Sequence, residues 1–171
     1  MVRKLFAVVI ALIVAAWLPC AANTRGPSTP EERAKVLEYT RSLEQHPLAK
    51  DSLQKRMWLS EWIVQVPDVS VNVCCKQLKQ LESLDKVNDT YSNQLRMQMV
   101  YSQAAFLVEH PEEKNTAAIE AAGLAGTLRA YRAIQQFDPT VKYPLLDSLM
   151  SLEKHGKLQK YVQHQQPCNG T

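Results

Sequence analysis

The sequence lacks the short motifs that identify most familiar enzymes. It contains no glycine-rich phosphate loop, no His-Glu-x-x-His zinc helix, no nucleophile elbow and no calcium loop. The phosphate loop supplies backbone donors, and the zinc helix supplies metal ligands. The nucleophile elbow supplies an activated serine, and the calcium loop supplies oxygen ligands. Their absence removes the usual arguments for these activities without excluding an enzyme built on other residues. We therefore expect a protein with no cofactor and no metal, and the sequence favours a non-catalytic protein over an enzyme.

The chain also has little net charge. It contains 20 Lys and Arg against 17 Asp and Glu, a formal charge of +3 at pH 7. Residues 1–22 hold two of the basic residues and none of the acidic ones, which leaves 18 against 17 in the remainder, or +1. Binding to nucleic acid or to an anionic membrane depends on clustered positive charge. No such cluster is present, so neither is an expected partner.

The long apolar run at residues 5–18 is too short for an ordinary membrane span. It has 14 residues, whereas a spanning helix needs about 20. A basic start precedes it, and small residues at 20–22 follow it, as in a signal peptide. We expect residues 1–22 to be removed after Ala22 and the protein to be periplasmic or secreted, with no membrane span. An uncleaved anchor is the alternative; the residues before Cys20 do not resemble a lipoprotein site.

Caps, prolines and apolar spacing predict an all-α protein. Residues 23–29 are expected to be a flexible linker, 30–165 the helical domain and 166–171 a C-terminal tail. Thr29, Pro30 and Glu32 combine a cap, a proline at the first helical position and an acid three residues after the cap. The pattern favours six or seven helices in a single compact domain, either an irregular bundle or stacked hairpins. The expected helices are 30–45, 50–66, 73–84, 89–109, 116–137, 144–155 and 157–164.

One segment carries a signal for a strand. Val69, Val71 and Val73 alternate with polar residues, but no second convincing strand follows that could pair with them. An unpaired strand leaves its backbone groups without partners. We therefore interpret 69–72 as an extended lead into the helix at 73–84, with pairing across a homodimer as the alternative.

Proline recurs where one predicted helix ends and the next begins. His46-Pro47 and His110-Pro111 open two similar seven-residue segments, and Asp138-Pro139 closes the helix 116–137 in a related way. The segment LRAYRAIQQFDP resembles the end of a tetratricopeptide unit over about a dozen residues. That resemblance implies stacked helical hairpins. No regular 34-residue period accompanies it, so a tetratricopeptide-like solenoid is the minority interpretation.

The helix 116–137 carries small residues at every fourth position. Ala118, Ala122, Gly126 and Ala130 form a stripe that lets another backbone approach closely. Such a stripe marks either an interface for a partner helix or a tightly packed central helix, and the second is the more usual. Gly123 and Gly126 each cost about 1 kcal/mol relative to alanine inside a helix, so close packing should compensate for them.

Five polar or aromatic residues are candidates for binding. Glu120, Arg129 and Arg132 lie on the helix 116–137 and could form a pocket for an anion or a substrate if they converge. Trp58 and Trp62 are four residues apart and could stack a sugar or an aromatic ligand. Each group has an ordinary alternative: the charged residues as a solvated face, and the tryptophans as part of the core.

The histidines all fall at predicted helix ends. His46, His110, His155 and His164 are explained there by capping, because the helix dipole favours cations at a C-terminus.

The best interpretation of the sequence is thus an exported helical binding or interaction module whose partner, protein or small molecule, it does not name. The alternative is a secreted hydrolase or thiol-dependent enzyme with a polar cleft on the helix 116–137, using Glu120, the two arginines or His155.

Three cysteines remain after removal of Cys20. Cys74 and Cys75 cannot easily bridge each other, because consecutive α-carbons are about 3.8 Å apart, less than a disulfide usually spans. On a helix Cys74 aligns with leucines as a core thiol, whereas Cys75 faces polar residues and is the better partner for Cys168. An exported protein permits such a bridge. A zinc site with His164 and a redox pair are alternatives, but the spacing fits neither.

Overall fold

Seven α-helices and no strand are formed by the residues that the computed structural model describes, namely 25–73, 76–82, 84 and 90–165. The all-α prediction is confirmed. In that part of the chain no helix is both long and apolar enough to cross a membrane. The helices are α2 (Pro30–Gln45), α3 (Ser52–Gln65), α4 (Lys76–Leu81), α5 (Ser92–Glu109), α6 (Thr116–Phe137), α7 (Pro144–Lys154) and α8 (Leu158–Gln163).

Helices α2 and α6 begin and end at the predicted residues. At the start of α2, Thr29 Oγ1 accepts a hydrogen bond from the Glu32 amide at 3.2 Å, and Glu32 Oε2 accepts one from the Thr29 amide at 3.0 Å. This is the reciprocal capping box that the sequence predicts. Asn115 caps α6 through its side-chain oxygen, which accepts from the amides of residues 117 and 118.

Three helix ends share one turn geometry. His46, His110 and Asp138 each precede a proline, which forces them out of the helical region to φ values of −135°, −129° and −129°. Each still closes its helix with its amide and then accepts a hydrogen bond from the amide three residues later. The three closing turns are His46 to Ala49, His110 to Glu113 and Asp138 to Val141. The proline repeat in the sequence is thus a repeat of turns.

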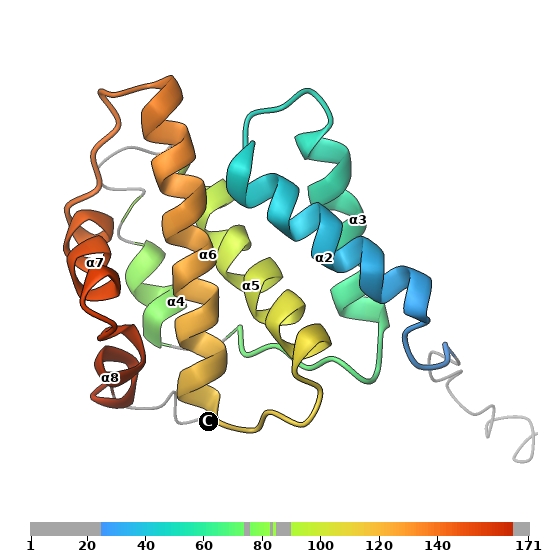
Figure 1. Ribbon diagram of the computed structural model, residues 1–171. Coiled ribbons are helices and arrows are strands. Elements are labelled where there is room, and N and C mark those ends of the chain that lie inside the picture. The colour runs from blue at the N-terminus through green and yellow to red at the C-terminus, as the bar shows by residue number, and fades with distance from the viewer. Residues whose placement is uncertain (1–24, 74–75, 83, 85–89, 166–171) are drawn as a thin grey trace, which may run out of the picture.

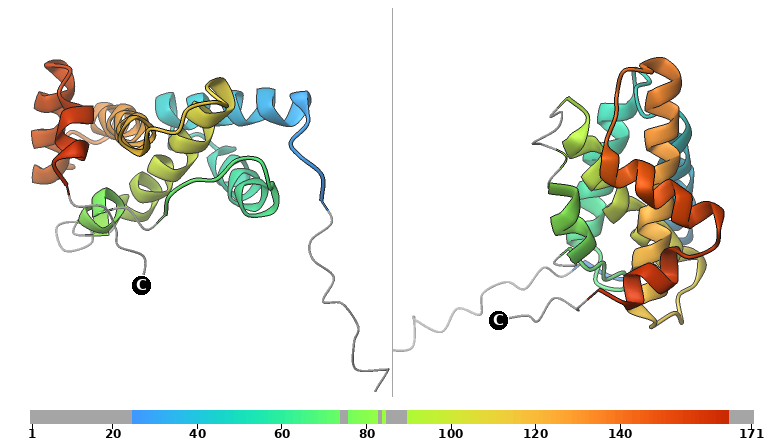
Figure 2. Two further views of the ribbon diagram at one scale, coloured as in Figure 1. Left: turned by 90° about the horizontal axis from the view of Figure 1, so that it is seen from below. Right: turned by 90° about the vertical axis from the view of Figure 1, so that its left-hand side faces the viewer.

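Helices α5 and α6 form the centre of the molecule. They pack along each other, with α2 and α3 on one side and α7 and α8 on the other (Figure 1). The view from below in Figure 2 shows the same order of layers. The hairpins α2/α3 and α5/α6 stack through contacts of α2 with α5 and α6. The third pair of helices does not repeat this hairpin, because α7 and α8 have only 11 and 6 residues.

Two hydrophobic clusters meet at α5. One lies between α4, α5, α6, α7 and α8, and the other between α2, α3 and α5. Leu95 and Met99 of α5 belong to the first cluster, and Tyr101 and Ala104 belong to the second. A helix that is buried on opposite sides needs apolar residues all round rather than along one stripe.

A glycine of α6 explains how closely α5 and α6 approach. A Cβ on Gly123 would lie 2.8 Å from Gln103 Cγ and 2.8 Å from the carbonyl oxygen of Met99. No side chain fits there without a shift of the α5 backbone. Gly123 therefore serves close packing of α6 against α5, the compensation that the sequence predicts for the glycines of this helix.

The segment at 69–72 is extended but not part of a sheet within the described residues. Val69 is buried in the α2/α3/α5 cluster. The amide of Asn72 donates to Gln103 Oε1 at 3.2 Å, so a side chain of α5 takes the place of a neighbouring strand. The helix that follows, α4, begins at Lys76 rather than at 73.

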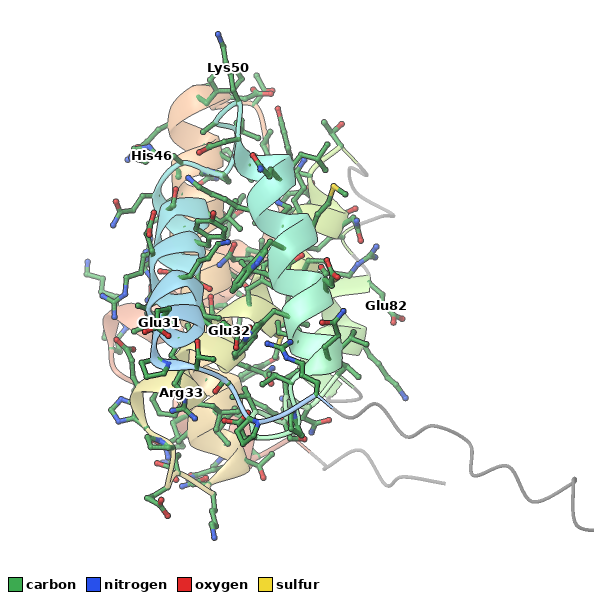
Figure 3. The ribbon with its side chains drawn as sticks, turned by 90° about the vertical axis from the view of Figure 1, so that its right-hand side faces the viewer. Glu31, Glu32, Arg33, His46, Lys50 and Glu82 are labelled. Carbon is green, nitrogen blue, oxygen red and sulfur yellow. The ribbon has the colours of Figure 1, made fainter. Side chains whose placement is uncertain are left out.

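Asp68 fastens the chain before α2 to the loop after α3. Its carboxylate accepts from the Ser28 amide at 2.8 Å, from the Ser28 hydroxyl at 2.7 Å and from Arg33 at 2.9 Å. Burial alone would raise the pKa of Asp68, but these hydrogen bonds outweigh it and lower the pKa to about 2. Figure 3 shows Arg33 at this end of α2 and His46 at the other end.

Tyr131 attaches α7 to α6. Its hydroxyl donates to Asp147 at 3.0 Å and accepts from Gln135 at 2.8 Å and from the Tyr143 amide at 3.0 Å. Burial, together with the Asp147 carboxylate and despite the Tyr143 amide, raises the pKa of Tyr131 to about 12. The hydroxyl therefore stays protonated and acts as a fixed junction at the start of α7.

All four histidines are C-caps, as their positions predict. They follow α2, α5, α7 and α8. His155 Nδ1 lies 2.7 Å from the Ser151 carbonyl oxygen, and His164 Nδ1 lies 2.6 Å from that of Lys160. These rings thus satisfy carbonyl groups that the ends of α7 and α8 leave open.

Candidate functional site

A polar cleft of about 450 Å³ lies where α2, α5 and α6 meet. Each of the three helices contributes a wall, so residues far apart in the sequence come together. Charged side chains come from all three helices, and small residues come from α5 and α6. The lining residues are Thr40, Arg41, Glu44, Gln45, Ser102, Ala105, Phe106, Glu109, Ala122, Ala125 and Arg129.

The charged centre of the cleft is an ion pair between α2 and α6. The Glu44 carboxylate is buried and accepts from Arg129 Nε at 2.7 Å and from Arg129 Nη2 at 2.8 Å. It also accepts from Ser102 Oγ of α5 at 2.8 Å, and Gln98 donates to that hydroxyl at 3.1 Å. This side-on geometry is the strong form of the arginine–carboxylate pair. The pair fixes all three helices to one another.

Gly126 makes room for this arrangement. A Cβ on Gly126 would lie 1.9 Å from Ser102 Oγ and 2.6 Å from Glu44 Oε1. Both distances are far below van der Waals contact, so no other residue fits there unless Ser102 or Glu44 moves. The cost of a glycine inside α6 is thus offset by the hydrogen bonds that it permits.

Thr40 brings an unused polar group to the same cleft. Its side chain is 1% exposed, and its hydroxyl has no hydrogen-bond partner among the described residues. Most buried hydroxyls are paired, so an exception calls for an explanation. The Thr40 residue lines the cleft, while its hydroxyl oxygen itself is closed to solvent.

A second ion pair spans the mouth of the cleft. Arg41 of α2 contacts Glu109 of α5, and both side chains are partly exposed. Phe106 lies on the same wall and packs against the ring of His110, with 4.6 Å between the ring centres. The formal charges of the two arginines and two glutamates sum to zero.

The three charged residues predicted on α6 do not converge. Only Arg129 reaches the cleft. Arg132 pairs with Glu153 of α7 on another side of the helix. Glu120 is buried, where its Oε1 accepts from Asn72 Nδ2 at 3.2 Å; burial raises its pKa, and the Asn72 hydrogen bond opposes that rise. The three residues thus belong to three separate contacts, because each meets a different neighbouring element.

The two tryptophans form an aromatic cluster on α3. Their rings stack with centres 6.2 Å apart, and Tyr39 meets Trp58 edge-on at 5.5 Å. Trp62 is 2% exposed, so its faces are not open to a ligand. A smaller hollow of about 280 Å³ is lined by both tryptophans and by Arg25, which donates to Gln65 and Glu32. This cluster is better explained as core.

The predicted pair Cys75 and Cys168 lies outside the described residues, as do Cys74 and the predicted signal peptide at 1–22. The disulfide and the cleavage after Ala22 therefore stay predictions.

Sequence reasoning missed the acidic half of the site. Glu44 follows Thr40 by four residues and Leu37 by seven, so it falls on the stripe of α2 that also holds Val36 and Leu43. A carboxylate on the buried stripe of an amphipathic helix needs a partner, because an unpaired buried charge is very costly. That signal could have identified Glu44 and suggested a search for an arginine elsewhere.

Comparison with known proteins assigns no activity to this cleft. The chain matches no family model, no curated protein and no solved structure. Within the described part of the chain, no three His, Cys, Asp or Glu side chains gather so that they could hold a metal ion.

Proposed function

We propose that this protein is an exported, non-catalytic binding module whose ligand enters the cleft between α2, α5 and α6. The observation that carries the proposal is the Thr40 hydroxyl, which is buried in the wall of the cleft with no partner among the described residues. Leaving such a group unsatisfied costs about 1–3 kcal/mol. The hydroxyl oxygen is closed to solvent in the free protein, so a ligand recovers that cost once the Thr40 side chain rotates toward the cleft. The volume of about 450 Å³ lies in the range of small-molecule sites.

The state of the carboxylates supports binding rather than catalysis. Glu44 already accepts three hydrogen bonds, two of them from Arg129, and Glu109 is paired with Arg41. A general base needs a free lone pair within reach of the proton that it removes. The residues that line the cleft include no histidine, cysteine or tyrosine. The walls therefore supply donors and charge, but no poised base or nucleophile.

The alternative, a secreted enzyme that uses the polar residues of α6 and His155, has less support. It needs those residues to face one reacting group. Glu120 instead binds Asn72, Arg132 binds Glu153, and His155 caps α7 through the Ser151 carbonyl. Contacts on three different elements argue against a shared active site.

Export rests on the sequence of residues 1–22, and a mass measurement tests it. The full sequence is expressed in a bacterial host, and the protein from the periplasm or medium is analysed intact. Loss of residues 1–22 is the expected result. Recovery of the uncleaved chain from the membrane fraction would replace export by anchoring. Alkylation of the same sample without reduction counts the free thiols; three would exclude the Cys75–Cys168 bridge.

Binding is tested by nuclear magnetic resonance on the isotope-labelled exported chain. A set of small acids, amines, sugars and short peptides is added, and backbone amide shifts are followed. The proposal predicts that the compounds that bind shift amides of residues 40–45, 102–109 and 122–129, because these segments form the three walls. Shifts confined to other segments, or none with any compound, would contradict it.

A pair of variants on α6 provides the control. Ala125→Phe places a ring in the cleft, because Ala125 is a half-buried residue of the α6 wall. Ala133→Phe makes the same change on the same helix, in a separate shallow hollow beside Phe137. Binding should be lost in the first variant and kept in the second. Equal losses in both would show that the effect comes from α6 as a whole rather than from the cleft.

A further inference from the structure

We infer that the ligand of the cleft is a monocarboxylate with a short apolar chain, bound by Arg129, Arg41 and Thr40. This inference rests on the proposed function and adds the chemical class of the ligand. It follows from the exposure of the four charged side chains of the cleft, from the donors that the two arginines keep free, and from the apolar residues of the lining.

Of the four charged side chains of the cleft, the two arginines and Glu109 reach the solvent and Glu44 is buried. The Arg129 side chain is 45% exposed, while Glu44, its partner, is 7% exposed. At the mouth, the Arg41 side chain is 57% exposed and that of Glu109 is 36% exposed. An entering ligand thus meets two exposed guanidinium groups and one exposed carboxylate, because the Glu44 carboxylate is covered. The field at the mouth favours an anion.

Both arginines keep donors that no described residue uses. Arg129 binds Glu44 through Nε and Nη2, which leaves its Nη1. Arg41 binds Glu109 through Nη2, which leaves Nε and Nη1. The planar fork of a guanidinium matches the two oxygens of a carboxylate. A carboxylate can therefore bind without displacing either existing ion pair.

Thr40 of the α2 wall adds a donor next to Arg41 in the sequence; its hydroxyl is buried in the free protein, so its side chain rotates toward the cleft to meet the ligand. A hydroxyl can donate its hydrogen to a carboxylate oxygen, and the Thr40 hydroxyl has no other partner among the described residues. An amine ligand would also find an acceptor there, but it would have to pass the two arginines first. The hydroxyl and the guanidinium donors together select an acceptor that carries negative charge.

The remaining wall suits a hydrocarbon chain. Ala105, Phe106, Ala122 and Ala125 line the cleft without polar side-chain atoms. The pairs with Glu44 and Glu109 leave the site neutral overall, so a second negative charge on the ligand would face carboxylates that are already present. A single carboxylate on a short chain thus fits better than phosphate or a dicarboxylate. A free organic acid and the C-terminus of a peptide share this chemistry.

The test compares probes of one length on the exported chain by isothermal titration calorimetry. Hexanoate, hexanamide and hexylamine differ in the charge of one end, and inorganic phosphate tests a multivalent anion. The proposal predicts that hexanoate binds and that the uncharged amide binds about tenfold or more weakly, since it loses a charge-assisted hydrogen bond. A tripeptide with a free or an amidated C-terminus distinguishes a peptide source from a free acid.

Three variants locate the binding. Thr40→Val should weaken hexanoate about fivefold or more while Tm stays equal or rises, because the variant removes a hydroxyl that is unpaired in the free protein. Glu44→Gln with Arg129→Gln removes both charges together and should abolish hexanoate binding. Arg132→Gln is the matched control: Arg132 lies one turn further along α6, is 42% exposed and is paired with Glu153 outside the cleft. It should bind hexanoate as the unchanged protein does.

The outcomes separate this inference from the proposed function. Hexylamine binding at the cleft as tightly as hexanoate, or phosphate binding more tightly, overturns the carboxylate assignment and leaves a binding cleft. Hexanoate affinity that is equal in the T40V and R132Q variants also overturns it. If no probe binds and no compound of the wider set shifts the three walls, the proposed function fails as well.

Discussion

Replacing Gly126 with alanine should destabilise the protein, although alanine is the better helix former. A Cβ at this position would lie 1.9 Å from Ser102 Oγ, 2.4 Å from Ser102 Cβ and 2.6 Å from Glu44 Oε1. Since atoms do not approach so closely, Ser102 and the Glu44 carboxylate must move apart from α6. That movement breaks the hydrogen bonds that join Ser102, Glu44 and Arg129.

The size of the loss follows from opposing contributions. The helix propensity of alanine favours the variant by about 1 kcal/mol. Overpacking costs about 1–3 kcal/mol, and displacement of a carboxylate that accepts three hydrogen bonds costs about 2–3 kcal/mol. The free energy of unfolding should therefore fall by about 2–5 kcal/mol. In a chain of this length that lowers Tm by roughly 4–20 °C.

Urea unfolding followed by far-ultraviolet circular dichroism measures the loss. Gly26→Ala is the matched control, because a Cβ on Gly26 would meet nothing within 4 Å, and it should change stability by less than about 0.5 kcal/mol. Ser102→Gly removes two of the three clashing atoms, so Gly126→Ala should cost at least about 1 kcal/mol less in that background. A G126A protein as stable as the unchanged one, or more stable, would refute the packing argument.

Three further predictions concern stability. Glu120→Gln should stabilise the protein near pH 7 but not at about pH 4, because burial raises the Glu120 pKa above its ordinary value of 4.5 and the ionised form lowers stability as pH rises. Asp68→Asn should do the reverse: the low pKa of Asp68 contributes stability above about pH 3.8 that is lost as pH falls towards 2. Tyr131→Phe should cost about 1–3 kcal/mol, because the bond to Asp147 is lost in a buried junction.

Urea midpoints near pH 7 and pH 4 test the Glu120 variant, and midpoints near pH 7 and pH 2 test the Asp68 variant. The two variants should show pH dependences of opposite sign. A Glu120→Gln variant less stable than the unchanged protein near pH 7 would mean that the ionised carboxylate has favourable partners. For Tyr131→Phe, hydrogen exchange in α7 should rise more than in α2, because the hydroxyl joins α6 to the start of α7. Equal changes in both helices would show that the junction is not local.

The helices could be predicted because residues close to each helix end in the sequence determine where the helix begins or stops. The capping box at Thr29 and the cap at Asn115 fix α2 and α6 through residues within one turn. Prolines 47, 111 and 139 fix where helices stop, since proline acts on its own neighbours. The short helix α4 was harder, because its start depends on how 69–72 packs against α5 through Asn72 and Gln103.

The cleft could be predicted only in part. Arg129 stood out as a charged residue within an apolar helix, but its neighbour Arg132 carried the same signal and pairs elsewhere. The two are three residues apart, so they emerge about 60° apart around α6 and meet different helices. Which of them faces Glu44 depends on how α2 crosses α6, and that angle is set by packing over the whole domain. Gly126 indicated that another helix passes close to α6 at this position, but the sequence did not show which residues of that helix would face it.

The proline turns also prevent two consecutive helices from joining into one continuous helix. Proline after the C-cap has no amide hydrogen for a helix and clashes with the preceding turn, so α2 cannot run on through Pro47 into α3. Where such a break is missing, two helices can fuse into one rod that pairs with the same rod of a second molecule, an exchange called domain swapping. The turns at 46–49, 110–113 and 138–141 thus oppose the fusion of consecutive helices into one rod at three places.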